Sequence, residues 1–242
     1  MKENLMITVL FFLLSISFAV KSQDAVAILK KVDEITAQAN DITQNVEITL
    51  INKNNQQQVR TGYVIQKGSD KRLFKFETPS SYAGVSFLSL PNNVMYLYMP
   101  SYGNERRIAS SVKNQKFAGT DMSYEDLEAK NYSDKYTPKL ISSDANLYLL
   151  ELTPLDNSTY SKVVLSVKKA DFTPTKAEFF DRGSNKIKVS EFEFTKQGSY
   201  WYPKTLTVKD LKTNHTTVMK TIEVKFNQNL SDDLFSVRNM MN

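Results

Sequence analysis

Apolar and polar residues alternate with a period of two along most of this chain. Val46, Ile48 and Leu50, for example, alternate with Glu47 and Thr49. Such alternation is typical of β-strands with one buried face. Similar runs, separated by short turn segments, occupy residues 59–65, 72–77, 85–90, 94–99, 105–108, 146–153, 162–168, 176–181, 186–195, 200–209 and 216–227. Because strand and turn follow each other at nearly regular spacing, the pattern predicts an antiparallel meander and a mainly β fold.

One segment near the N-terminus has the period of a helix instead. Ile28, Val32 and Ile35 recur at i, i+4 and i+7, and charged residues lie between them. We therefore predict a helix over residues 24–38, with Asp24 as its N-cap.

Two of the predicted strands carry apolar groups on both faces. Residues 94–99 read VMYLYM, and residues 147–152 read LYLLEL. A strand with two apolar faces is covered on both sides or lines a pocket. Two arrangements satisfy this requirement. In one, a helix covers one face of the sheet and loops cover the other; in the second, the sheet curves around the N-terminal helix and leaves an apolar cavity between them.

The first 22 residues have the organisation of a secretory signal peptide. Lys2 precedes a mostly apolar run over residues 5–20, and Val20 and Ser22 occupy the positions of the small residues before a cleavage site. We predict cleavage before Gln23 and a mature chain in the periplasm or beyond it; the alternative is an uncleaved membrane anchor. Because the chain has no cysteine, we expect neither disulfides nor a lipidated cysteine after the signal.

Charge and length limit the partners and the domain organisation. The formal charge is +5 for the whole chain and falls to +4 without residues 1–22, which hold two lysines and one glutamate. The charges are mixed in sign along the chain, so nucleic acid is not an expected partner. No Pro/Gly/Ser-rich linker or repeat interrupts residues 23–242, which we interpret as a single domain.

The residues offer little catalytic chemistry. His215 is the single histidine and falls in a predicted hairpin turn, where we expect it to be solvated, and no glycine-rich phosphate loop is present. The segment GTDMSYEDLE holds the densest set of carboxylates, namely Asp121, Glu125, Asp126 and Glu128. Ser123 and Asp126 have the spacing of a capping box, which predicts the start of a short helix. The alternatives are a catalytic carboxylate pair and a calcium loop.

Four segments together resemble one known family. They read RLFKFETPSSYAGVSFLSL (72–90), MYLYMPSYGNERRI (95–108), KFAGTDMSYEDLE (116–128) and LSDDLFS (230–236). In the third, a phenylalanine–glycine–Ser/Thr–Asp–x–Ser–Tyr–Glu–Asp–Leu pattern runs from Phe117 to Leu127, with Ala118 inserted after the phenylalanine. Following a signal peptide and an amphipathic helix, these segments are similar to the LolA-like outer-membrane lipoprotein-sorting family over nearly the whole mature chain.

The resemblance implies both a fold and a role. The fold is a half-open β-barrel, a strongly curved antiparallel sheet with an N-terminal helix and short helices over its concave apolar face. The role is that of a monomeric periplasmic carrier, without catalytic activity, cofactor or metal. It shelters the acyl chains of a lipoprotein or another lipid for transfer toward the outer membrane, between an inner-membrane transporter and an outer-membrane acceptor. An accessory or sensor module of an envelope transport or stress complex, and a carboxylate hydrolase, stay open as alternatives.

Candidate site residues follow from strand alternation and from the resemblance. Arg72 shares a strand face with Phe74 and Phe76. The resemblance implies that an arginine at this place holds the lid helices through their backbone carbonyls. We expect lipid contacts at Phe74, Phe76, Tyr96, Tyr98, Leu149, Phe192 and Phe194.

Overall fold

The structure, a computed structural model, describes residues 19–156 and 158–242. Most of the predicted signal peptide therefore lies outside the described residues. The first helix, α1 (Ala19–Thr36), begins before the predicted start, so residue 24 lies within the helix and not at its N-cap. Ile28 and Val32 of the predicted apolar stripe are buried. Within the two described ranges, no helix is long and apolar enough to cross a membrane.

In the described part of the chain, thirteen strands form one antiparallel sheet. The first six are β1 (Asp41–Ile51), β2 (Gln57–Lys67), β3 (Lys71–Thr78), β4 (Ser86–Leu90), β5 (Val94–Tyr98) and β6 (Glu105–Arg107). The remaining seven are β7 (Tyr136–Ser143), β8 (Leu147–Pro154), β9 (Lys162–Lys168), β10 (Pro174–Phe180), β11 (Lys186–Gln197), β12 (Tyr200–Asp210) and β13 (His215–Phe226). The sequence therefore predicted the meander and twelve of these strands, but it did not predict β7.

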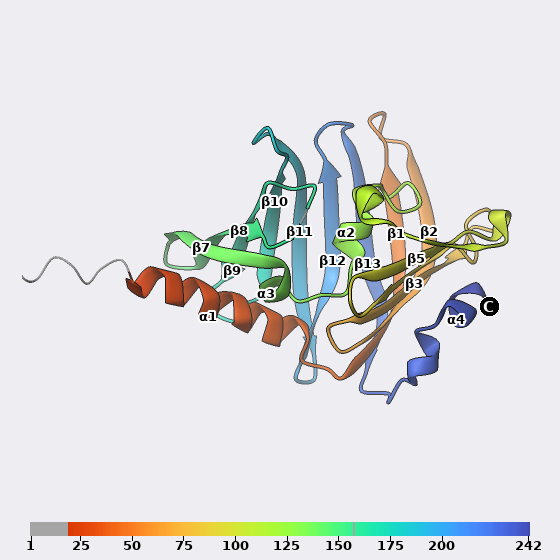
Figure 1. The fold of residues 1–242 in the computed structure, drawn as a ribbon, viewed down its shortest axis with the longest axis horizontal. Helices are drawn as coiled ribbons and strands as arrows, with labels where there is room; N and C mark the ends of the chain where they lie inside the picture. The colour runs from red at the N-terminus through yellow and green to blue at the C-terminus, as the bar shows by residue number, and fades with distance from the viewer. Residues whose placement is uncertain (1–18, 157) are drawn as a thin grey trace, which may run out of the picture.

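The order of the strands places both ends of the meander at the centre of the sheet. The order is β6-β5-β4-β3-β2-β1-β13-β12-β11-β10-β9-β8-β7, with β1 paired to β13. The chain thus runs from the centre to the edge at β6, crosses to the opposite edge at β7, and returns to the centre (Figure 1). Because the edge strands β6 and β7 do not pair with each other, the sheet stays open. This arrangement confirms the predicted half-open barrel.

The segment that crosses between the two edges, residues 108–135, carries three short helices. They are η2 (Ser110–Val112), α2 (Tyr124–Leu127) and α3 (Tyr132–Lys135). Figure 1 shows α2 in front of the central strands and α3 beside α1. We call residues 108–135 the crossing segment. Together with α1, the crossing segment covers the concave face of the sheet.

Two apolar clusters lie beneath this cover. One joins the crossing segment to β1–β5 through the buried residues Val46, Ile48, Val64, Phe74, Phe76, Phe87, Met95, Phe117 and Tyr124. In this cluster the Phe117 ring lies 5.2 Å from the Phe74 ring and 5.4 Å from the Phe76 ring. The other cluster joins α1 to β7–β10 through Ala25, Leu29, Val32, Leu150, Leu152, Leu165 and Val167. The space between the two clusters is where the site described below lies.

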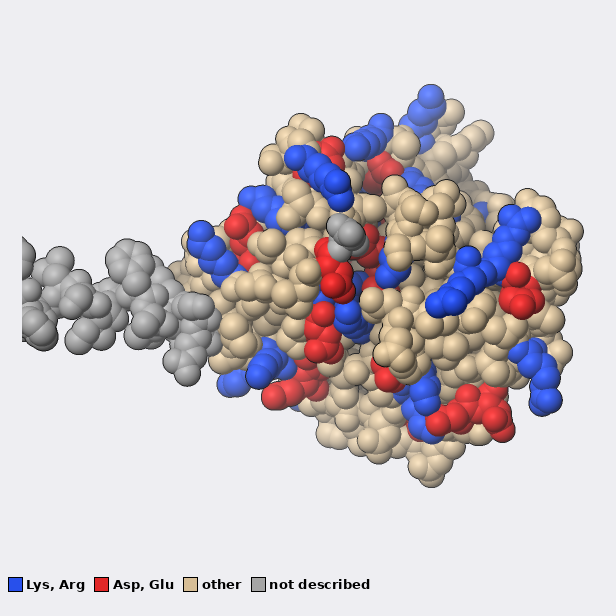
Figure 2. Space-filling view, viewed as in Figure 1, with Lys and Arg blue, Asp and Glu red and all other residues tan. Residues whose placement is uncertain are grey.

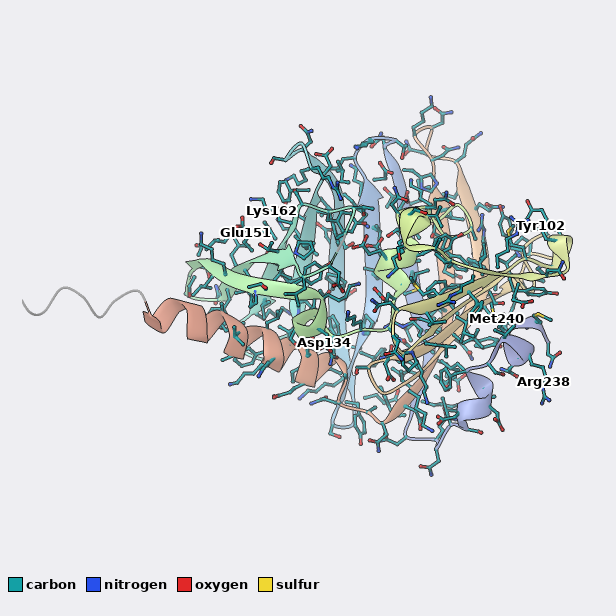
Figure 3. The ribbon with its side chains drawn as sticks, viewed as in Figure 1. Tyr102, Asp134, Glu151, Lys162, Arg238 and Met240 are labelled. Carbon is teal, nitrogen blue, oxygen red and sulfur yellow. The ribbon has the colours of Figure 1, made fainter. Side chains whose placement is uncertain are left out.

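A third cluster lies on the opposite, convex face of β2–β5. It contains Ile65, Leu73, Leu88, Phe235 and Met240, with Tyr96 and Tyr98 packed against it. The cover on this side is the C-terminal segment with η3 (Asp232–Leu234) and α4 (Val237–Met241), whose Met240 lies toward the sheet (Figure 3). Segment 94–99 is apolar on both faces because each face is covered.

Candidate functional site

A cavity of about 300 Å³ lies between the concave face of the sheet, α1 and the crossing segment. The helical side contributes Thr36 at the end of α1, Ala37 just after it, and Leu127 and Tyr132 of the crossing segment, together with charged side chains such as those of Asp33 and Lys135. The sheet contributes mostly apolar side chains, namely Ile42, Val64, Phe74, Phe179, Phe192, Phe194, Trp201, Leu206, Val208 and Met219. These residues come from β1–β3 and β10–β13, which are the middle strands of the sheet. The cavity therefore lies in the curve of the barrel.

Arg72 lines the cavity and joins the sheet to the crossing segment. Its Nη1 donates to the backbone carbonyl of Leu127, the last residue of α2, over 3.0 Å. Its Nε and Nη2 both donate to Oε1 of Gln66, at 3.0 and 2.6 Å. Burial lowers the pKa of the Arg72 guanidinium to about 10. Within the described structure, Arg72 therefore reaches one backbone carbonyl of the crossing segment, and this carbonyl lies at the end of α2.

Asp33 makes the corresponding link between α1 and α3. Its two carboxylate oxygens accept hydrogen bonds from the backbone N–H groups of Tyr132 and Ser133, at 2.7 and 3.0 Å. These groups belong to the first turn of α3, where N–H donors have no partner within the helix. Burial raises the pKa of Asp33, against the opposing effect of the hydrogen bonds. Burial, with the nearby Asp33 and Asp126 charges, also raises the pKa of Tyr132 to about 12.

The structure brings only some of the predicted lipid-contact residues together. Phe74, Phe192 and Phe194 line the cavity. Phe76 lies behind the cavity wall, fully buried, with its ring 4.9 Å from that of Phe74.

The other predicted lipid-contact residues lie elsewhere. Tyr96 and Tyr98 pack in the convex cluster beneath the C-terminal segment. Leu149 precedes Leu150, whose side chain packs in the cluster with α1, so strand alternation directs Leu149 to the other face of β8. Alternation correctly predicts which residues share a face, but it does not say which face is concave.

The predicted capping box at the start of α2 is present. The Ser123 N–H donates to Oδ2 of Asp126 over 2.7 Å, and the Asp126 N–H donates to Oγ of Ser123 over 3.2 Å. Asp126 also pairs with the buried ammonium of Lys188 and accepts a hydrogen bond from the Tyr160 hydroxyl. Burial alone would raise its pKa, but Lys188 and Ser123 together hold the pKa of Asp126 below its ordinary value.

Asp121 anchors the crossing segment to β13, and its partner Lys116 anchors it to β12. Its carboxylate accepts hydrogen bonds from Thr217 and Lys116, both at 2.8 Å, and lies 2.6 Å from Nδ1 of His215. Lys116 also contacts Asp210. The expectation of a solvated His215 is therefore wrong: the imidazole begins β13 and lies against a buried carboxylate.

The four carboxylates of segment 119–128 do not converge on one another. Glu125 accepts hydrogen bonds from Ser158 and Thr159, and Glu128 pairs with Lys113 and Lys135. Glu125 thus fastens the crossing segment to residues 158 and 159, whereas both partners of Glu128 lie within the crossing segment itself. Among the residues that the structure describes, no three acidic or histidine side chains are grouped so that they could hold a metal ion.

Two basic residues that were not predicted to be buried lie in the interior of the protein. Lys188 is 6% exposed, and Arg60 is 2% exposed. Arg60 lies 3.4 Å from the Tyr82 ring centroid and donates to the Ala118 carbonyl over 2.6 Å. The available signal was that Arg60 alternates with Gly62 and Val64, which makes it a charged residue on a strand face that is buried.

Comparison with known proteins identifies the family. A family model with the description "Uncharacterized protein" matches residues 68–242. No curated protein matches the chain.

Solved structures with the same fold cover 91% of this chain. A domain assigned as an outer membrane lipoprotein-sorting protein, from Vibrio parahaemolyticus, has a TM-score of 0.85 and 24% identity and is covered over 100% of its own length. A LolA superfamily protein from Nitrosomonas europaea has a TM-score of 0.75 and 27% identity, and a DUF1329 family protein from Desulfovibrio piger has 0.84 and 21%; each is covered over 99%. The chain therefore belongs to the family of the matching model, and its resemblance to the LolA-like lipoprotein-sorting proteins is confirmed.

Proposed function

We propose that this protein is a periplasmic carrier that shelters lipid acyl chains in the cavity between the sheet and its helical cover. The observation that carries the proposal is the cavity itself, about 300 Å³ in volume, whose sheet side is lined mostly by apolar side chains. Ligand sites of proteins commonly have volumes of roughly 300–1,000 Å³. The relatedness of the fold to a lipoprotein-sorting domain supports the same role.

Acyl-chain binding needs no catalytic residue. Each CH₂ group removed from water contributes about 0.8 kcal/mol, so half a dozen buried groups contribute roughly 5 kcal/mol. Release then requires an acceptor of comparable apolarity. Within the described residues, the hydrogen bonds of Arg72 and Asp33 join the cover to the sheet and to α1. Hydrogen bonds to charged groups contribute roughly 1.5–3 kcal/mol each, so separating these contacts costs several kcal/mol, comparable to the gain from burying the acyl groups.

The cellular setting is part of the proposal. The chain is exported, cleaved before Gln23 and active as a monomer in the periplasm. It receives a lipoprotein or another lipid from an inner-membrane transporter and delivers it to an outer-membrane acceptor.

Native mass spectrometry of residues 23–242, purified from a periplasm without detergent, tests this function. We expect an adduct of acyl-lipid mass, or uptake of added palmitate. Phe192→Glu places a charge in the cavity wall and should abolish the adduct. The matched control is Ile222→Glu, because Ile222 is 67% exposed and does not line the cavity.

Three outcomes are informative. Loss of the adduct in Phe192→Glu but not in Ile222→Glu, with unchanged circular dichroism, supports the carrier. Equal binding by both variants would place the lipid outside the cavity. A clean mass with no palmitate uptake would overturn lipid carriage and favour an accessory or sensor module of an envelope complex.

A further inference from the structure

We propose that the cavity continues into a headgroup site for a zwitterionic lipid that carries a phosphate and a primary ammonium group. The inference rests on the proposed function, since it names the class of lipid that the carrier takes. The ammonium end enters a small polar pocket beside α2, and the phosphate lies at the junction between this pocket and the cavity.

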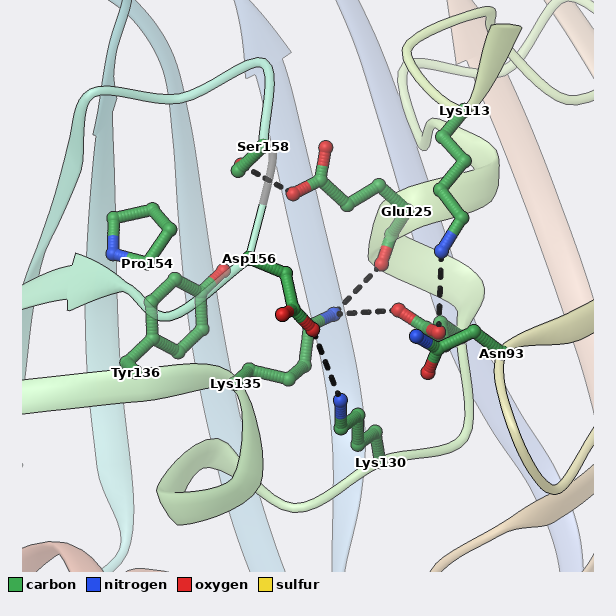
Figure 4. Close-up of a pocket in the computed structure, with 10 residues that line it drawn as sticks. Asn93, Lys113, Glu125, Lys130, Lys135, Tyr136, Pro154, Asp156 and Ser158 are labelled. Carbon is green, nitrogen blue, oxygen red and sulfur yellow. Dashed lines mark hydrogen bonds and ion pairs between the residues drawn. The ribbon is translucent and has the colours of Figure 1, made fainter. Parts of the chain in front are cut away.

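The polar pocket adjoins the cavity directly. Its volume is about 40 Å³, and Glu128, Lys130, Lys135 and Tyr136 line both spaces. Figure 4 shows Lys113, Lys130 and Lys135 reaching into the pocket from different parts of the crossing segment. An amphiphile with its chains in the cavity would therefore meet these polar groups at the cavity end.

The lining of the pocket carries equal numbers of positive and negative charges. The three ammonium groups of Lys113, Lys130 and Lys135 face the three carboxylates of Glu125, Glu128 and Asp156. Figure 2 likewise shows acidic and basic side chains gathered together at the centre of this face. An anionic headgroup would lie against the three carboxylates, and a cationic headgroup would lie against the three ammonium groups. A zwitterionic headgroup can pair with both kinds.

The ion pairs around the pocket are long, although the Lys135 ammonium also donates to the backbone carbonyl of Glu125 over 2.8 Å. The Lys130–Asp156 and Lys135–Glu128 pairs both span 3.7 Å, and the Lys113–Glu128 pair spans 3.4 Å. By comparison, the Lys116–Asp210 pair spans 2.7 Å. The side chains of Lys113 and Glu128 are nevertheless only 14% and 7% exposed. Buried charges in long ion pairs gain from additional ligand contacts, because the low dielectric strengthens each contact.

The size of the pocket selects the ammonium end. A pocket needs about 10–15 Å³ to hold one water-sized group. The 40 Å³ of this pocket therefore hold about three groups of that size. An aminoethyl group has three non-hydrogen atoms. Its ammonium can donate to Glu128 and Asp156, while the phosphate stays beside Lys130 and Lys135 at the junction. A trimethylammonium group is too bulky for this volume and has no N–H to donate.

The test compares lipids that differ only in the headgroup. The probes are dihexanoyl phosphatidylethanolamine, dihexanoyl phosphatidylcholine, dihexanoyl phosphatidylglycerol and dihexanoylglycerol, which has no headgroup. Dissociation constants are measured by calorimetry on residues 23–242. We expect the ethanolamine lipid to bind at least about threefold more tightly than each of the others, as partly exposed ion pairs would give.

A charge exchange at the pocket rim provides the matched variants. Asp156→Lys changes a side chain that is 73% exposed and makes the pocket lining positive. It should shift preference toward the phosphatidylglycerol lipid by about threefold or more. Glu191→Lys makes the same change in net charge at an exposed position outside the pocket and should leave the preference unchanged.

The outcomes separate this inference from the proposed function. Equal affinity for all four lipids would overturn the headgroup site and leave the carrier in place. Absence of binding by any of them, including dihexanoylglycerol, would overturn both. A shift in Glu191→Lys as large as that in Asp156→Lys would show that net charge, and not the pocket, sets the preference.

Discussion

Single carboxylates hold the cover over the cavity, and each one does so at a different place. Asp121 connects the crossing segment to β13, Asp126 connects it to Lys188 on β11, and Asp33 connects α1 to α3. The Asp121 carboxylate is fully buried, so its partners are needed to offset the loss of hydration. Removal of one partner would leave part of a buried charge unpaired.

The pH dependence of stability should show the burial of Asp33. Burial raises its pKa in the folded protein above the ordinary value of 3.8. Between these two pKa values the folded chain binds more protons than the unfolded chain, so ionisation of Asp33 destabilises the fold as the pH rises. The free energy of unfolding of the wild type, relative to Asp33→Asn, should fall over this interval by up to about 1.4 kcal/mol per pH unit.

Urea unfolding from pH 3.5 to 7 checks this difference. Asp70→Asn, at an exposed position, controls for the loss of a surface carboxylate. If the wild type instead gained stability relative to Asp33→Asn over the same range, the hydrogen bonds from Tyr132 and Ser133 would outweigh burial.

Local residue contacts could be predicted, and distant ones could not. The Ser123–Asp126 capping box is visible because its two members are three residues apart. The His215–Asp121 and Lys188–Asp126 contacts join residues that are 94 and 62 positions apart. Such pairs depend on which strands become neighbours in the sheet, and no local pattern contains that information.

Among the elements, the C-terminal helix α4 covers one face of the sheet. The alternation of apolar residues alone does not predict this cover. Tyr96 and Tyr98 lie on one face of β5, as the period of two requires, but they face α4 and η3 rather than the cavity. The cover of each sheet face comes from segments far away in the chain. For this reason the sequence predicted Phe74, Phe192 and Phe194 correctly as cavity residues, but it also predicted residues that lie elsewhere, such as Tyr96 and Tyr98.

Two adjacent methionines of α4 offer a direct test of this cover. Met240 is fully buried against the convex face, whereas Met241 is 38% exposed. Met240→Ala should lower the free energy of unfolding by about 2–3 kcal/mol, because it leaves a cavity against the sheet. Met241→Ala should change it by less than about 0.5 kcal/mol. Urea unfolding measures both values, and equal effects would show that α4 does not contribute to the core.

At the scale of the whole molecule, the pairing of β1 with β13 joins the two halves of the sheet. Ile42 lies opposite Phe226, and Ile51 lies opposite Thr216. This pairing closes a very long loop, and contacts of such sequence separation slow folding. The sheet continues without a break from β6 to β7, so we predict that residues 23–242 unfold as one cooperative unit.

Two spectroscopic probes test this cooperativity. Fluorescence reports on Trp201, the single tryptophan, which lies at the cavity. Far-ultraviolet circular dichroism reports on the whole sheet. We expect both urea midpoints to coincide and refolding to take milliseconds to seconds. Separate midpoints would divide the chain into two units and contradict the single domain.

The open seam between β6 and β7 gives the sheet the mechanics of a ring that has been cut once. A closed ring of strands fixes its own diameter, because strand number, tilt and stagger are linked. A cut ring can widen through a small change of twist distributed over thirteen strands, with every hydrogen-bonded ladder kept. Ligands of different width could then bind in the same cavity, because the sheet would bend without breaking its hydrogen bonds.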